Sequence, residues 1–566
     1  MFKPEILNSI KKYSAKTFAS DFTAGIIVGI VALPLAIAFA IASGVEPAAG
    51  LFTAIIAGFL ISAFGGSSVQ IGGPTGAFTV IIYGIVSQYG LSGLATATVM
   101  AGIILVLLGA FKMGGLVKFI PYTIVTGFTA GIAVTIAGGQ IANFLGLSVT
   151  INEANPLVIM GETFTKVPGD FLPKMIAFGS FFETIDVYSL LVAGISLVFL
   201  FVWNKFIKKI PGSIIVILAA TVISVILRNT RGLEIAVIGE IPSSFPSPVV
   251  PDFGLKTVTS LFPTAVSIAV LAAIESLLSA SVADGMTGDR HDSDTELIGQ
   301  GIANIVTPFF GGIPATGAIA RTATNIKNGG RTPVAGIIHA LTLLIIVLFA
   351  GKYASLIPLP ALAAVLINVA WNMAGFGSIR ALLKGQKSDI FVFTVTFIIT
   401  VFVDLTVAIT VGLGFAAFFF IKKMIDLSEV QNEREILTGG IASKNYSDRI
   451  EEKLDIPEGV LVYEIDGPLF FGTVRKFEVA VEKARVNCRV LVFRMRNTIY
   501  LDAGGLKALE QAQNACTRLG IKIVLSGIHT QPYLLCEKSG MADRIGRENI
   551  CANINDALLR AKELLK

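Results

Sequence analysis

Two glycine- and proline-containing segments far apart in the chain repeat one pattern. The first runs from Gly72 to Ala77 (GGPTGA), and the second runs from Gly311 to Ala318 (GGIPATGA). Proline prevents a continuous helix and glycine lets the backbone run extended, so each segment predicts a break before a short helix. The first turn of such a helix carries unpaired N–H groups and a positive dipole end. Both breaks could be mere kinks or packing points, but a matched pair favours an anion site between two helix starts.

Arg321 lies little more than one turn into the second short helix. A guanidinium inside a membrane span is costly unless it is paired or faces water. It could attract the anion, or it could be the structural partner of a buried carboxylate or reach the cytoplasmic interface. We favour attraction of the anion.

Glu275 is the lone charged residue of the apolar stretch 266–281. Such a carboxylate at membrane depth is by default a candidate for carrying a proton or binding an ion. A structural alternative, compatible with the first, is that it accepts hydrogen bonds from the freed amides of a neighbouring broken helix. We predict that Glu275 takes up a proton during transport.

Composition places these residues in a membrane. The chain is 54% hydrophobic and only 15% charged, with a mean hydropathy of +0.77, whereas soluble domains carry about a quarter charged residues. Residues 1–425 contain 24 Lys and Arg with 19 Asp and Glu, and residues 426–566 contain 20 of each. The net charge of +5 therefore belongs to the apolar part. There it indicates topology rather than a nucleic-acid partner.

Fourteen apolar segments are predicted to lie in the membrane, in repeats of about 21–230 and 256–425. A single crossing needs about 20 residues, and the segments that start at Thr75 and Thr316 are too short to cross alone. The predicted segments are 21–43, 48–64, 75–88, 92–111, 121–145, 187–207, 212–228, 258–283, 295–310, 316–326, 333–350, 357–372, 389–403 and 405–422.

The basic residues of the short loops set the orientation. With an even number of spans they all fall on one side, Lys11, Lys112 and Lys384 among them, and the acidic loop 146–186 falls on the other. Cytoplasmic loops are the positively charged ones. We therefore predict a multi-pass protein of the cell membrane whose N-terminal residues 1–20 and C-terminal tail both face the cytoplasm.

Residues 440–566 predict a small α/β domain. β-branched runs predict strands at 459–465, 489–493 and 521–525, and helical patterns cover 477–484, 504–519 and 555–565. The four cysteines all lie after residue 487, without metal-ligand spacing. With no phosphate loop, nucleophile elbow or zinc motif either, we expect no metal, no cofactor and no enzyme activity.

The chain resembles the SulP family, known in animals as solute carrier family 26. The resemblance lies in LPLAIAFA (33–40), QIGGPTGAFTV (70–80), AIESLLSASVAD (273–284) and GGIPATGAIARTATN (311–325). The tail resembles a STAS domain, the sulfate-transporter and anti-sigma-factor-antagonist module. The family implies fourteen spans in a seven-plus-seven inverted repeat, and a homodimer. A core of spans 1–4 and 8–11 would move like an elevator against a gate of spans 5–7 and 12–14.

The resemblance also implies the residues that bind the anion, at the starts of spans 3 and 10. They are Phe39, Thr75, Gly76, Ala318, Ile319, Ala320 and Arg321. Glu275 matches the acidic position of span 8, where glutamate favours a proton over sodium as the coupling ion. The chain departs from the family at two positions. Many animal relatives have serine where Ala320 stands, and phosphorylatable STAS domains have serine where Ala503 stands, so we expect no phosphorylation there.

The sequence thus predicts a proton-coupled symporter of small anions, with sulfate as the first candidate and bicarbonate as the second. A dicarboxylate transporter of the same family and an uncoupled anion channel or exchanger remain alternatives. A nucleobase permease would lack the STAS tail and would need polar side chains to read a ring, which residues 316–320 do not supply. A membrane anchor would need neither the paired breaks nor the arginine.

Overall fold

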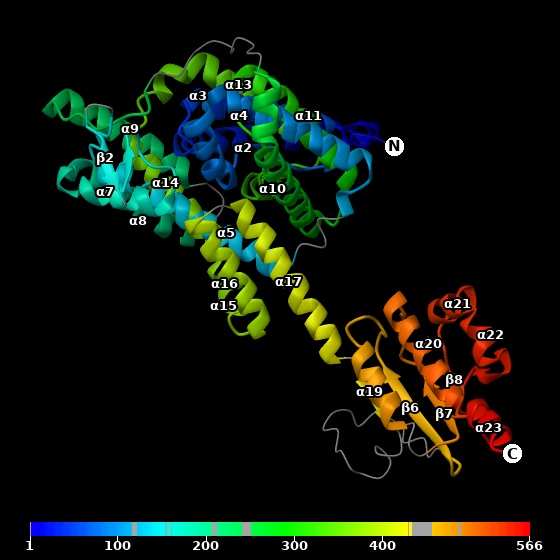
Figure 1. Cartoon of the computed structure of the whole chain (residues 1–566). Coiled ribbons are helices and arrows are strands. Elements are labelled where there is room, and N and C mark those ends of the chain that lie inside the picture. The colour runs from blue at the N-terminus through cyan, green and yellow to red at the C-terminus, as the bar shows by residue number, and fades with distance from the viewer. Residues whose placement is uncertain are drawn as a thin grey trace. The chain divides into compact units, whose positions relative to one another are not determined.

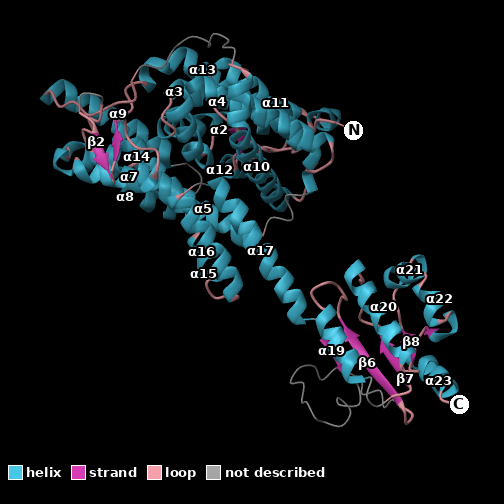
Figure 2. Ribbon diagram, in the orientation of Figure 1, coloured by secondary structure: helices cyan, strands magenta, loops and turns pink. Residues whose placement is uncertain are grey.

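The computed structural model describes residues 2–115, 121–152, 155–159, 161–206, 212–239, 251–403, 405–427, 429–432, 455–484 and 488–566. The chain forms two compact units, Met1–Gly414 and Phe415–Lys566 (Figure 1). The first unit is almost entirely helical, and the second contains a five-stranded sheet (Figure 2).

Long apolar helices make up the first repeat. They are α2 (Ala15–Ala42), α3 (Pro47–Phe64), α4 (Thr79–Ala110), α5 (Tyr122–Gly139), α8 (Val187–Phe206) and α9 (Gly212–Arg231). A short 3-10 turn, η2 (Gly76–Phe78), leads into α4. Within α4, Gly90 has φ 67° and ψ −170°, a conformation that favours glycine, so α4 holds two predicted segments separated by a break.

Seven helices of the second repeat correspond to its predicted spans. They are α10 (Leu255–Thr287), α11 (Ser293–Val306), α12 (Ile319–Lys327), α13 (Pro333–Ala354), α14 (Leu359–Ala374), α16 (Lys387–Phe402) and α17 (Leu405–Leu427). In the described part of the chain, nine helices are long and apolar enough to cross a membrane unaided, with residues 76–110 counted as one. Four helices outside this set (α8, α11, α12 and α16) fill the remaining predicted positions, so each of the fourteen predicted segments has its counterpart.

Contacts between the two repeats obey the symmetry of an inverted repeat. The first helix of each half packs against the fourth of the other, as α2 on α13 and α10 on α4. The second helix of each half also packs against the fourth helix of the other half, as α3 on α13 and α11 on α4. A Cβ on Gly102 would lie 2.7 Å from the Gly301 carbonyl, and a Cβ on Gly301 would lie 2.6 Å from the Gly102 carbonyl. Because neither residue has a side chain, α4 and α11 approach backbone to backbone.

The acidic loop between the fifth and sixth spans contains structure that the sequence did not predict. It holds a hairpin of β2 (Leu157–Ile159) and β3 (Glu162–Phe164), and then α7 (Phe171–Ser180). Tyr83 of α4 donates a hydrogen bond of 2.7 Å to the Val167 carbonyl. Lys174 of α7 lies over the Tyr83 ring, with Nζ 4.2 Å from its centroid. The loop is therefore fastened to the third span.

Because Lys174 is largely buried, we expect it to make the stability of the folded protein depend on pH. Burial lowers its pKa from 10.5 to about 8, with Asp170 acting in the opposite direction. A lysine with a lowered folded pKa destabilises the protein while it is charged, and this cost disappears as the pH rises from about 8 towards 10.5. We expect Lys174→Met to raise the melting temperature below pH 8, with a difference that narrows above it. Thermal unfolding measured across this range checks the effect.

The exposed Lys166 of the same loop provides the control for this measurement. A Lys166→Met variant should differ from the wild type by the same amount at every pH in the series. An equal pH trend in both variants would contradict a specific contribution of Lys174.

The C-terminal unit contains an α/β domain with the predicted strands and helices. Its sheet has the order β5-β6-β7-β8-β9, with β6 (Val460–Asp466), β7 (Val490–Arg494) and β8 (Lys522–Ser526) parallel at the centre. The predicted helices correspond to α19 (Val474–Ala484), α20 (Ala503–Arg518) and α23 (Ile554–Leu564). The sequence missed four short elements: β5 (Glu429–Asn432), β9 (Ile550–Cys551), α21 (Thr530–Lys538) and α22 (Met541–Ile545).

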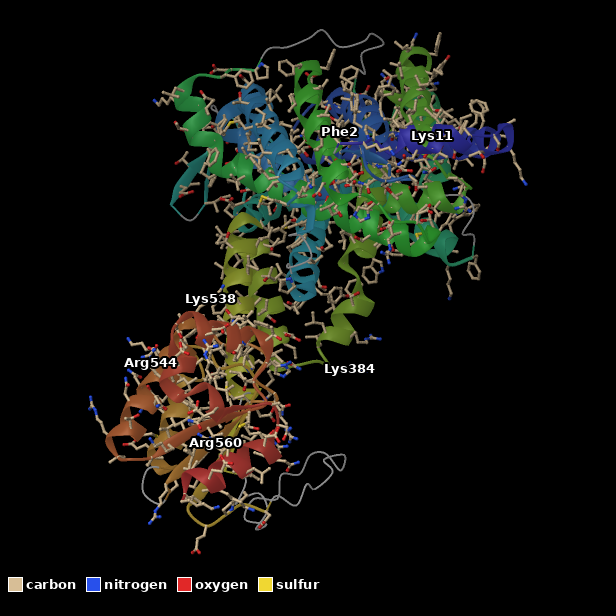
Figure 3. All side chains as sticks on the ribbon, turned by 90° about the vertical axis from the view of Figure 1, so that its right-hand side faces the viewer. Phe2, Lys11, Lys384, Lys538, Arg544 and Arg560 are labelled. Carbon is tan, nitrogen blue, oxygen red and sulfur yellow. The ribbon has the colours of Figure 1, made fainter. Side chains whose placement is uncertain are left out.

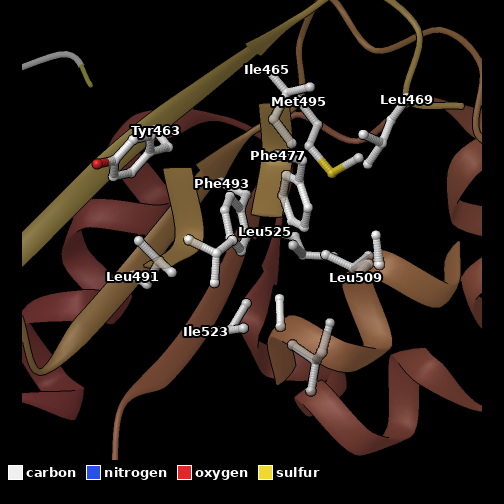
Figure 4. Packing of buried hydrophobic residues seen from close by; sticks show 14 of the residues in the cluster. Tyr463, Ile465, Leu469, Phe477, Leu491, Phe493, Met495, Leu509, Ile523 and Leu525 are labelled. Carbon is white, nitrogen blue, oxygen red and sulfur yellow. The ribbon is translucent and has the colours of Figure 1, made fainter. Parts of the chain in front are cut away.

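Apolar side chains cover both faces of this sheet. On one face, Phe477, Phe493 and Leu509 are fully buried between the strands and the helices α19 and α20 (Figure 4). On the other face, a second cluster joins the strands to α23. Charged side chains such as Arg544 and Arg560 lie at the domain surface (Figure 3), where Arg544 pairs with Glu510. The domain therefore has a hydrophobic core of its own.

Candidate functional site

The two glycine–proline segments lie side by side and pair with each other. Strand β1 (Gly72–Gly73) runs antiparallel to β4 (Thr316–Gly317), with Gly72 opposite Gly317 and Gly73 opposite Thr316. The Ala318 N–H continues the pairing with a 2.9 Å hydrogen bond to the Ile71 carbonyl. We call this pairing the crossover. Non-helical backbone is tolerated at membrane depth only where protein groups or water satisfy it, as the paired strands do here.

A half-helix begins directly after each strand of the crossover. The first extends from Gly76 to the break at Gly90, and the second is the nine-residue α12. At about 1.5 Å per residue, neither is long enough to cross a bilayer. Among the described residues no side chain caps either start, at Thr75 or at Ala318. Two positive helix ends with uncapped amides therefore lie close together, as an anion site requires.

The other predicted contact residues surround these two starts. A Cβ on Gly76 would lie 3.1 Å from Phe39 Cε1, so the Phe39 ring packs against the first half-helix. At the second start Ala318 is buried, whereas Ile319 is 40% exposed and Ala320 is also exposed. The structure thus brings together the positions predicted from sequence. Their contact with an anion stays a prediction.

Glu275 of α10 reaches the start of the first half-helix. Thr75 Oγ1 donates a hydrogen bond of 2.9 Å to Glu275 Oε2, and both residues are partly exposed. The next residue, Ser276, contacts the other segment, because its Oγ lies 2.6 Å from Thr316 Oγ1 and accepts from the Gly317 N–H at 3.1 Å. Consecutive residues of α10 therefore touch both sides of the crossover. The partner of the Glu275 carboxylate is a hydroxyl rather than a backbone amide.

Arg321 is built into the crossover itself. Its side chain is 2% exposed, and Nη2 donates a hydrogen bond to the Pro74 carbonyl. Gly73 has φ 148°, and a Cβ there would collide with Arg321 Nη1, so only glycine fits this position. The guanidinium pairs with a carbonyl and does not reach an interface. Its positive charge therefore lies beside Pro74, the residue that follows strand β1 and precedes Thr75.

Polar residues that sequence reasoning did not identify hold the second segment in place. Thr53 Oγ1 accepts a 2.7 Å hydrogen bond from the Ile313 N–H, and Asn304 pairs with both backbone groups of Ala315. On the first segment, Thr322 Oγ1 accepts from the Ile71 N–H at 3.1 Å. Thr53 and Asn304 lie outside the segments that carry the family resemblance, and Thr322 lies within one of them without a role that the sequence assigns. Only their three-dimensional partners reveal their role.

Comparison with known families decides the class of protein. A family model described as "Sulfate permease family" matches residues 18–396, and a "STAS domain" model matches residues 453–557. This chain belongs to the sulfate permease family.

Several known proteins are similar to this chain over most of their length. "Putative sulfate transporter YvdB" of Bacillus subtilis is 42% identical over 541 residues, which are 95% of this chain and 97% of that protein. "Bicarbonate transporter BicA" of Picosynechococcus is 30% identical over 562 residues, 97% of this chain and 96% of its own. The solved structure of the murine Solute Carrier 26 family member A9 anion transporter has a TM-score of 0.85 at 20% identity, covering 99% of this chain and 94% of that chain.

The murine structure is similar to this sulfate permease family member in fold. Together with the symmetric helix contacts, it confirms a helical membrane transporter fold with a seven-plus-seven arrangement and a C-terminal STAS domain.

Proposed function

We propose that this protein is a secondary active transporter of small anions. The observation that carries the proposal is the pair of uncapped half-helix starts, held together by the β1–β4 pairing. Such starts bind negative charge through backbone amides without a formal counter-charge. Phe39, Thr75, Gly76, Ala318, Ile319, Ala320 and Arg321 would surround the anion.

Sulfate is the first candidate substrate and bicarbonate is the second. The names "Putative sulfate transporter YvdB" and "Bicarbonate transporter BicA" support this order, because YvdB is the more similar of the two to this chain, at 42% against 30% identity. A small oxyanion also suits a site whose donors are mainly main-chain N–H groups. Dicarboxylates remain the alternative within the same family.

Transport would be driven by a proton that Glu275 carries, with sodium less favoured. The carboxylate lies against Thr75, at the start where the anion would bind, so proton and anion would occupy neighbouring positions. We propose an elevator movement because every residue that builds the site belongs to spans 1–4 or 8–11. The site could then move as one body against the remaining helices.

The surroundings of the transporter follow from sequence and resemblance. We propose that it lies in the cell membrane with both termini in the cytoplasm, as the basic short loops favour. From the resemblance alone we also propose a homodimer.

Uptake into proteoliposomes of purified protein tests the proposed function. Radiolabelled sulfate, bicarbonate and succinate are offered with an inward proton gradient, with an inward sodium gradient and with neither. We expect sulfate to accumulate only with the proton gradient. Preferred uptake of succinate would select the dicarboxylate alternative, and large currents without a gradient would indicate a channel. A protein that moves none of these anions under any gradient would contradict the proposal.

A further inference from the structure

A buried histidine lies beside the crossover and has no role in the site described so far. His339 of α13 is 0% exposed, and apart from an interaction with the Gly336 carbonyl one turn earlier in α13, neither ring nitrogen has a hydrogen-bond partner among the residues that the structure describes. Arg321 Nη1 is also buried without such a partner. Buried polar atoms are nearly always hydrogen-bonded, to protein or to ordered water. Two unpaired groups close together therefore call for a common explanation.

One face of α3 locates the two groups relative to each other. Ala54 and Gly58 are four residues apart and lie on the same face. A Cβ on Gly73 would touch Arg321 Nη1 and lie 3.4 Å from Ala54 Cα. A Cβ on Gly58 would lie 3.3 Å from His339 Cε1 and 3.4 Å from Nδ1. The guanidinium and the imidazole therefore both lie near this face of α3, beside residues that are about 6 Å apart along the helix.

A single buried water molecule can connect two polar groups placed in this way. Two hydrogen bonds of ordinary length through one water span about 5.5 to 6 Å, and buried waters typically join otherwise unpaired polar groups. The two side chains are also close enough to interact electrostatically. A second cation next to the buried guanidinium would be costly, so the imidazole is the uncharged acceptor and the arginine is the donor.

We infer that His339 is a positioning residue for Arg321, with its uncharged imidazole accepting through one buried water the hydrogen bond that Arg321 Nη1 donates. Nη2 is held by the Pro74 carbonyl and Nη1 by the water. The guanidinium is then fixed on two sides, and its charge stays next to the start of the first half-helix. The effect on anion affinity rests on the proposed function, whereas the contact between the two side chains does not.

Nitrogen NMR of the full-length protein tests the contact without any transport. The chain has three histidines, so ¹⁵N-histidine labelling gives few signals. His291→Gln and His529→Gln identify two of them and leave that of His339. We expect Arg321→Ala to shift the His339 signal and Val347→Ala, a buried change two turns further along α13, to leave it in place. An unchanged His339 signal in Arg321→Ala would overturn the inference.

Anion uptake by the same variants tests the positioning role. His339→Leu should raise the KM for sulfate about tenfold, as expected for loss of a hydrogen bond to a charged group. Its Vmax should change little, and His339→Gln, which keeps an acceptor, should restore most of the affinity. In a protein that already carries Arg321→Ala, the additional His339→Leu substitution should not raise the KM for sulfate any further.

Two outcomes of the uptake experiment would overturn the positioning role. One is a change in Vmax alone, and the other is a double variant whose KM rises by the product of the single effects. A wild type that transports none of the anions would instead contradict the proposed function. The NMR result would then decide the His339–Arg321 contact by itself.

Discussion

Replacing Glu275 with glutamine is expected to abolish proton-driven accumulation of the anion while leaving anion exchange intact. Glutamine keeps the shape of the side chain and an oxygen that accepts from Thr75 Oγ1, but it cannot take up or release a proton. Two negative charges about 5 Å apart repel by about 3 kcal/mol at an effective dielectric of about 20. An anion at the helix start and a proton on Glu275 would therefore favour each other's binding, and this reciprocity would couple the two fluxes.

Parallel uptake and counterflow measurements in proteoliposomes check this expectation. In Glu275→Gln, labelled anion should exchange for unlabelled anion at a rate close to that of the wild type, but a proton gradient should no longer concentrate it. Glu46→Gln is the matched control, because Glu46 is exposed just before α3 and should accumulate anion normally. Accumulation that persists in Glu275→Gln would refute the coupling role.

Arg321→Ala is expected to weaken anion binding by at least tenfold and to lower the stability of the protein. The substitution removes the charge next to the first half-helix and leaves the buried Pro74 carbonyl without this donor. Loss of a charged hydrogen bond costs about 1.5–3 kcal/mol, which corresponds to roughly tenfold or more in affinity. The two effects have separate readouts, the KM of uptake and the midpoint of thermal unfolding.

Arg321→Lys separates charge from geometry. An ammonium keeps the positive charge but cannot donate in two directions from one rigid plane. We therefore expect Arg321→Lys to have a KM for the anion and a melting temperature between those of the wild type and of Arg321→Ala. Arg331→Ala removes an exposed arginine from the loop after α12 and should leave the KM unchanged. If Arg321→Ala loses stability but binds sulfate with the wild-type KM, the arginine has only a structural role.

The sequence predicted the helical architecture well because each signal was local. Runs of apolar residues about 20 long have few alternatives to a membrane helix, and the break at Gly90 was predicted as a gap between two segments. The structured loop was missed because the β2–β3 hairpin and α7 depend on tertiary contacts, such as that of Lys174 with Tyr83. Strand β9 has only two residues, which is too short to leave a periodic pattern.

At the candidate site, sequence reasoning found the positions but not the directions of the side chains. The repeated glycine–proline pattern predicted that two helix starts face each other, but not that their backbones pair as β1 and β4. The sequence could not show that Arg321 turns towards the Pro74 carbonyl. That orientation is possible only because Gly73 has no side chain, so that Arg321 Nη1 can lie where a Cβ would be. Thr53 and Asn304 were missed for the same reason, since each acts on a residue of another element.

The β1–β4 pairing has a consequence for how such a protein can change over evolutionary time. The N–H groups at the two helix starts belong to the main chain, so an exchange of one amino acid, proline aside, leaves them in place. Mutations at exposed neighbours such as Ile319 and Ala320 would instead alter the shape and polarity around the proposed anion site. Related proteins could then differ in the anion they transport while the same main-chain N–H groups bind its negative charge.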